Sequence, residues 1–173
     1  MVDGASRTLS AVERQAAALE GLRAALDTRE IKALKVAITE GRSAGVDEAL
    51  VEDASKVLAV EERREAALAE LHIAITGTDI ERLRAAIAEA YEAEVDPDTV
   101  DHSWYVLCSL KVKDAMSRRG ITDLRAAILE GKEAYLEADL LEEAQRVLTA
   151  EELKASAVQR INEAMGDEWK TFF

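Results

Sequence analysis

The chain has 173 residues, of which 49% are hydrophobic, 4% are aromatic and one is proline. This length can bury one continuous core, and the abundance of alanine, leucine and glutamate favours packed helices over sheets. The formal charge of −13 disfavours nucleic acid and anionic membrane surfaces as partners, because both attract lysine and arginine. No apolar run is long enough to insert into a membrane.

The first helix is predicted over residues 11–26, where a capping-box pattern at Ser10 marks its start. A short helix over residues 29–43 follows, and Gly45 supplies a left-handed stop. Asp47 then caps a long helix that ends at Gly77. With about 28 residues, this helix would be roughly 40 Å long.

The middle of the chain repeats this order of elements. A capping box at Thr78 opens a second short helix. Asp96 caps the next long helix, Pro97 occupies its first turn, and Gly120 is expected to end it. Thr122 and Asp139 then start the last short and long helices, residue 166 (glycine) is expected to end the last one, and seven helices result.

One pattern occurs three times in the chain, at residues 34–41, 83–90 and 124–131, and the copies are 49 and 41 residues apart. This spacing is typical of helical hairpins that stack as an α-solenoid. The sequence therefore predicts an all-α fold with a single helical-repeat domain over residues 1–166 and an aromatic tail over residues 167–173. The domain would comprise a half repeat at 10–27 and full repeats at 28–77, 78–120 and 121–166.

The pattern Leu-Arg-Ala-Ala-Ile-x-Glu-Gly, followed by Gly-Val-Asp-x-x-Leu-Val, resembles uncharacterised α-helical repeats in large proteins of algae and other protists. The resemblance covers roughly residues 10–165. It implies spacers or interaction surfaces and no catalytic residue, and it suggests as an alternative a stabilising peripheral subunit of a large assembly such as a photosynthetic membrane complex. The single cysteine favours a reducing compartment, so an intracellular protein is expected, soluble or peripheral, in the cytoplasm or in an organelle such as a plastid.

Residues that could carry chemistry are few. His72 and His102 lack the glutamate three residues earlier that di-iron helical bundles use. An enzyme or ligand-binding alternative would need Asp101, His102 and Cys108 to gather in one pocket, although His102 and Cys108 would lie about 120° apart around a helix. We therefore predict no catalytic, cofactor-binding or metal-binding residues. Glu40, Glu89 and Glu130 recur in all three copies and are interpreted as structural, or alternatively as an acidic row.

The middle long helix departs from the repeat in one place. Trp104 stands where the other long helices have Ser55 and Gln145. We predict that Val100, Ser103, Val106 and Leu107 form the core face of this helix. The adjacent arc would then hold a partner-binding surface, unless the protein itself covers it, and this arc comprises Trp104, Tyr105, Cys108 and Val112.

The C-terminal tail contains both phenylalanines of the chain and one of its two tryptophans. Large aromatic side chains are usually buried rather than solvated. Trp169, Phe172 and Phe173 are therefore predicted to bind a partner, or alternatively the body of the protein. Together these observations favour a non-enzymatic protein–protein interaction module, which would act as a spacer, linker or scaffold subunit within a larger complex.

Overall fold

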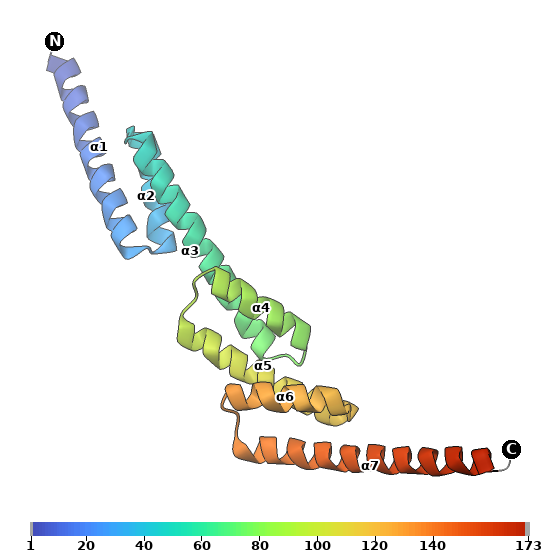
Figure 1. The fold of residues 1–173 in the computed structure, drawn as a ribbon. Coiled ribbons are helices and arrows are strands. Elements are labelled where there is room, and N and C mark those ends of the chain that lie inside the picture. Colours follow the sequence, from blue (N-terminus) through green and yellow to red (C-terminus); the bar gives the residue numbers. More distant parts are fainter. Residues whose placement is uncertain (1, 172–173) are drawn as a thin grey trace. The chain divides into compact units, whose positions relative to one another are not determined.

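The computed structural model describes the backbone of residues 2–171 and the side chains of residues 10–165. Within this range the chain forms seven helices and no strand, which confirms the predicted all-α fold of alternating short and long helices (Figure 1). None of the described helices is both long and apolar enough to cross a bilayer. The helices are α1 (Val2–Thr28), α2 (Ile31–Ala44), α3 (Glu48–Ile75), α4 (Ile80–Glu92), α5 (Pro97–Arg118), α6 (Ile121–Glu133) and α7 (Ala138–Thr171).

The chain divides into two compact units, and the division falls inside a helix. The first unit contains Met1–Ala69 and Glu92–Val95, and the second contains Glu70–Tyr91 and Asp96–Phe173. Helix α3 thus starts in the first unit and ends in the second.

Three of the predicted helix boundaries have the expected capping geometry. At the start of α3, the Asp47 carboxylate accepts a hydrogen bond of 3.1 Å from the backbone N–H of Ala49. Gly45 adopts a left-handed φ of 69° after α2. At the start of α5, the Asp96 carboxylate accepts a hydrogen bond of 3.1 Å from the backbone N–H of Thr99, and Pro97 is the first helical residue. These caps satisfy backbone groups that the helix itself leaves unpaired.

The prediction that Gly120 stops α5 is wrong. Arg119 takes the left-handed conformation (φ 58°), whereas Gly120 is extended and immediately precedes α6. Glu94 and Tyr135 are also left-handed, with φ of 53° and 54°. They occupy the repeat position of Gly45, so a left-handed residue ends all three short helices although only the first is a glycine.

The two outer helix ends also differ from the prediction. Helix α1 begins at Val2 rather than near Ser10, because residues 2–9 contain no proline and a helix that has formed propagates at little cost. Helix α7 continues through residue 166 to Thr171. One glycine lowers helix propensity by only about 1 kcal/mol, and the residues after it, Asp-Glu-Trp-Lys, can continue the helix.

The core of the first unit lies where the second half of α1, the short helix α2 and the first half of α3 meet. We call this three-helix cluster the first module. Its centre consists of aliphatic residues that are fully buried or nearly so. The buried residues are Ala18, Leu22 and Ala25 of α1, Leu34, Ala37 and Ile38 of α2, Val46 of the connecting loop, and Val51 and Ala54 of α3.

A second core of the same design lies within the second unit, formed by the second half of α5, by α6 and by the first half of α7. We call this cluster the third module, because it contains the short helix of the third repeat. Eight of its nine buried residues lie 90 positions after a buried residue of the first module, and the ninth, Leu148, lies 90 positions after the half-buried Leu58. They are Cys108, Val112 and Ala115 of α5, Leu124, Ala127 and Ile128 of α6, Leu136, and Ala144 and Leu148 of α7.

The first and third modules also have the same ion pairs between the short helix and the long helix that follows it. In each module, a cation just before the short helix and another within its first turns contact two consecutive glutamates of the long helix. The pairs are Arg29–Glu61 (3.1 Å) and Lys35–Glu62 (2.7 Å) in the first module, and Arg119–Glu151 (3.1 Å) and Arg125–Glu152 (2.6 Å) in the third.

This correspondence locates the eight residues that α5 lacks relative to α3. Leu107 matches Leu58, whereas the next residue, Cys108, matches Ala67. In α3 these two core positions are nine residues apart, which places them on opposite sides of the helix. In α5 they are consecutive and lie about 100° apart. The missing segment therefore corresponds to residues 59–66 of α3. The two α5 residues that flank the deletion are both buried, on adjacent sides of the helix.

Candidate functional site

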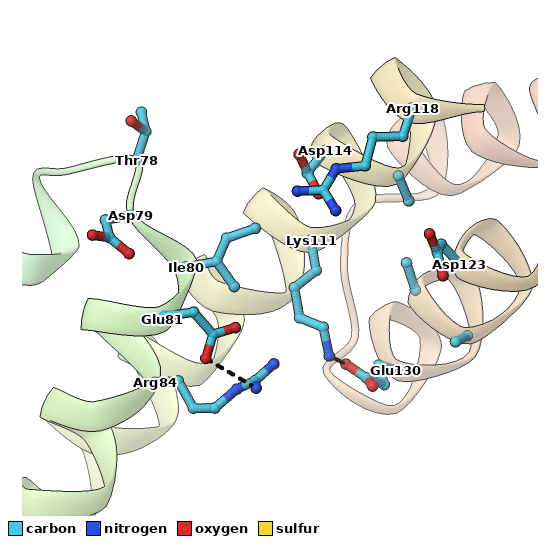
Figure 2. Close-up of a pocket in the computed structure, with 13 residues that line it drawn as sticks. Thr78, Asp79, Ile80, Glu81, Arg84, Lys111, Asp114, Arg118, Asp123 and Glu130 are labelled. Carbon is cyan, nitrogen blue, oxygen red and sulfur yellow. Dashed lines mark hydrogen bonds and ion pairs between the residues drawn. The ribbon is translucent and has the colours of Figure 1, made fainter. Parts of the chain in front are cut away.

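The shortening of α5 is accompanied by a polar cleft between three helices of the second unit. The cleft has a volume of about 550 Å³ and lies where the start of α4, the second half of α5 and one side of α6 face one another (Figure 2). Its charged lining residues are Asp79, Glu81 and Arg84 beside and within α4, Lys111, Asp114 and Arg118 of α5, and Asp123 and Glu130 of α6.

The three cationic groups of the cleft all contact carboxylates of the same lining. Arg84 pairs with Glu81 at 3.3 Å, and Arg118 pairs with Asp114 at 3.0 Å. Lys111 forms an ion pair with Glu130, which joins α5 to α6 (Figure 2). Five carboxylates face these three cations, so the cleft is acidic and would favour a cationic ligand over an anionic one.

Lys111 reverses the charge found at the corresponding position of α3. Because Lys111 follows the missing segment, it is aligned from the end of the helix and matches Glu70 of α3 and Arg160 of α7. Glu70 pairs with Arg82 of the short helix that follows α3 (2.8 Å), whereas Lys111 pairs with a glutamate of the short helix that follows α5. This exchange of charge was not predicted, although the reversed charge at a repeated position is visible in the sequence.

The four residues of the predicted aromatic face do not share one environment. Trp104 is exposed, with 43% of its surface accessible. Tyr105 is half-buried and packs against the core of the third module, while Cys108 and Val112 are fully buried in that core. Neither Cys108 nor Val112 can contact a partner while the module is folded, so the structure reduces the predicted surface to Trp104 with the edge of Tyr105.

This correction follows from the position of the deletion. Aligned from the start of α5, Cys108 and Val112 match Ala59 and Arg63 of α3, which are exposed. Aligned from the end of the helix, they match Ala67 and Leu71, which are buried. Residues after the deletion must be aligned from the end, because they pack in the next module. The predicted core face of α5 is confirmed for Ser103 and Leu107, which are buried, while Val100 and Val106 are half-buried.

The tail residues lie mostly outside the described part of the structure. Trp169 belongs to α7, but its side chain is not among those described, and Phe172 and Phe173 fall beyond the described backbone. Their predicted role in partner binding stays a prediction.

The residues of the enzyme alternative do not share a surface. Asp101 and His102 are exposed on α5, whereas Cys108 is buried. Burial raises the pKa of the Cys108 thiol, the Glu130 carboxylate adds to this effect, and Lys111 partly opposes it. A buried, protonated thiol is a poor nucleophile. Among the residues whose side chains are described, no group of three or more histidine, cysteine or acidic residues could hold a metal ion.

The repeated glutamates have different surroundings. Glu130 is the partner of Lys111, while Glu40 and Glu89 are exposed. A common role for the three as an acidic row stays a prediction.

Compared with protein families, with curated proteins and with solved structures, the chain has no match. The case for any function therefore depends on the residues and geometry described above.

Proposed function

We propose that this protein is a non-enzymatic interaction module, which acts as a spacer, linker or scaffold subunit and binds another protein through the surface around Trp104. The acidity of the chain supports a protein partner rather than nucleic acid. The burial of Cys108 apart from the exposed Asp101 and His102 weighs against the enzyme alternative.

The exposure of Trp104 is the observation that carries the proposal. The corresponding positions of α3 and α7, Ser55 and Gln145, are polar and complete the same repeat without an aromatic ring. The fold of the repeat therefore does not require tryptophan at this position. Exposed tryptophan is among the side chains that contribute most binding energy at protein interfaces. Tyr105 beside it packs against a core and so gives the surface a fixed base.

Replacing Trp104 with alanine tests the proposal. Purified wild-type protein and Trp104→Ala would be used as baits in extract of the source cells, with retained proteins quantified by mass spectrometry. A partner that binds through this surface should lose about 2 kcal/mol of binding free energy, or roughly 30-fold in affinity.

His102→Ala is the matched control, because His102 is exposed on the same helix but carries no large apolar surface. It should retain the partner at the wild-type level. The proposal is wrong if Trp104→Ala retains the same proteins as wild type, or if both variants lose them equally.

A further inference from the structure

The second half of α7 presents an apolar surface that no described part of the chain covers. This half of the helix extends past α6 (Figure 1), and every residue from 153 to 165 is exposed. Four large apolar side chains lie on this half of the helix, and each has more than half of its surface accessible to solvent. The exposed fraction of Ile161, for example, is 58%. The four are Leu153, Val158, Ile161 and Met165.

The repeat shows what this surface corresponds to. Ala157, Ile161 and Ala164 lie 49 positions after the three α5 residues that form one wall of the third module. They lie 90 positions after Ala67, Leu71 and Ala74 of α3, all of which are buried. Each long helix therefore has a Small-x-x-x-Aliphatic-x-x-Ala segment in its second half. The segments of α1, α3 and α5 are buried, and only that of α7 is exposed.

In the first and third modules, this segment is covered by the same arrangement of helices. A short helix and the first half of the next long helix close over it. In the first module the short helix approaches closely, since a Cβ atom added to Gly41 of α2 would lie 3.8 Å from Leu22 of α1. Ile161 occupies the repeat position of Leu22 and has a similar volume.

A positive charge beside the apolar surface adds a second requirement for any partner that binds there. Arg160 lies 49 positions after Lys111, which pairs with Glu130 of the short helix covering α5. A helix that covers α7 in the same way would bring the repeated glutamate of its own pattern to Arg160. The expected occupant is thus apolar along one face and acidic at a known position.

From this geometry we infer that the second half of α7 binds a helical hairpin of the same repeat type. The hairpin would consist of a short Leu-x-x-Ala-Ile-x-Glu-Gly helix followed by the first half of a long helix, offered by a partner protein. The inference deepens the proposed interaction function and rests on it, because it names the chemistry of one partner. The bound state would be a further module built like the first and the third.

The test uses the full-length protein and a synthetic peptide of residues 29–62 from the same chain. This peptide contains α2, the first half of α3 and both cross-helix ion pairs of the first module, so it reproduces one complete hairpin. Binding would be followed by fluorescence anisotropy of labelled peptide. We expect saturable binding, weakened at least 10-fold by Ile161→Asp. Gln159→Asp, about 200° away on the same helix, should bind within twofold of wild type.

A charge exchange tests the orientation of the hairpin. Arg160→Glu should weaken binding several-fold, as expected of one exposed ion pair, and a peptide carrying Glu40→Lys should restore it. Circular dichroism would verify that each variant keeps its helix content. Failure of the exchange to restore binding would refute the proposed orientation.

Three further results would overturn the inference. These are no saturable binding up to about 1 mM peptide, equal binding to wild type and Ile161→Asp, or self-association of the protein that Ile161→Asp abolishes, since a second copy would then cover the surface. Trp104 lies outside this surface, so Trp104→Ala should not change peptide binding. The outcome of the peptide test is therefore independent of the extract experiment, and either proposal can fail alone.

Discussion

Replacing Tyr135 with glycine should stabilise the protein, although the change removes an aromatic ring. Tyr135 ends the third short helix in a left-handed conformation with φ of 54°, and its side chain is 90% exposed. Gly45 has the same role in the first repeat at φ of 69°. The ring therefore contributes little burial, while its Cβ atom imposes a conformational cost that the first repeat avoids.

The size of the effect follows from two opposing contributions. A left-handed conformation costs a residue with a side chain roughly 1–2 kcal/mol. Glycine avoids this cost, but its greater conformational freedom in the unfolded chain lowers the stability of the folded state by about 0.5–1 kcal/mol. The backbone hydrogen bonds of the turn, from the N–H of residue 135 to Lys132 (3.2 Å) and from Leu136 to Gly131 (2.9 Å), are available to glycine as well. The difference between the two contributions is about 0–1.5 kcal/mol, so Tyr135→Gly should raise the free energy of unfolding by an amount near the middle of that range.

Urea unfolding followed by circular dichroism at 222 nm would measure this change. Tyr135→Ala is the matched control, because it removes the ring but keeps the Cβ atom, and its stability should stay within about 0.5 kcal/mol of wild type. The reasoning is refuted if the glycine variant is less stable than wild type. It is also refuted if alanine stabilises as much as glycine, because the gain would then come from losing the ring.

Two more predictions concern buried polar groups. Cys108 should resist alkylation by iodoacetamide at neutral pH and react fully in denaturant, because burial covers the thiol and raises its pKa. Mass spectrometry would measure the labelled fraction, and rapid labelling of the folded protein would contradict the prediction. Glu61→Ala should lower the free energy of unfolding by about 1–3 kcal/mol, because the side chain is only 11% exposed and contacts both Arg29 and Arg64. Glu62→Ala should cost less than about 1 kcal/mol, because its side chain is 45% exposed and pairs with one lysine; equal losses in urea unfolding would contradict this explanation.

The helices could be predicted from the sequence because apolar spacing and capping residues are local signals. Leu34, Leu83 and Leu124 recur in the repeated pattern, and all three are fully buried. Helix ends that depend on propagation were harder to predict. Ser10 has the residue type of a cap, but a helix continues through it when the upstream residues can also be helical.

The candidate surfaces were harder to predict because they depend on which module a residue packs in. Cys108 and Val112 look like extensions of the Trp104 face when α5 is read as one continuous stripe. They belong instead to the core that includes α6, and this becomes clear only when the helix is aligned from both ends. The cleft at Lys111 has the same origin, because it depends on α4 and α6 both facing the shortened α5.

The division of the long helices into two halves has a consequence for how such a chain can change its length. Insertions and deletions inside a helix usually rotate everything that follows and so misplace core residues. Here the segment absent from α5 lies between Leu107 and Cys108, close to where the contacts of one core give way to those of the next. Both sets remain buried on either side of the junction. The middle of a long helix in this protein is thus a place where about two turns can be lost while the core residues on both sides stay buried, a tolerance that most proteins have only in their loops.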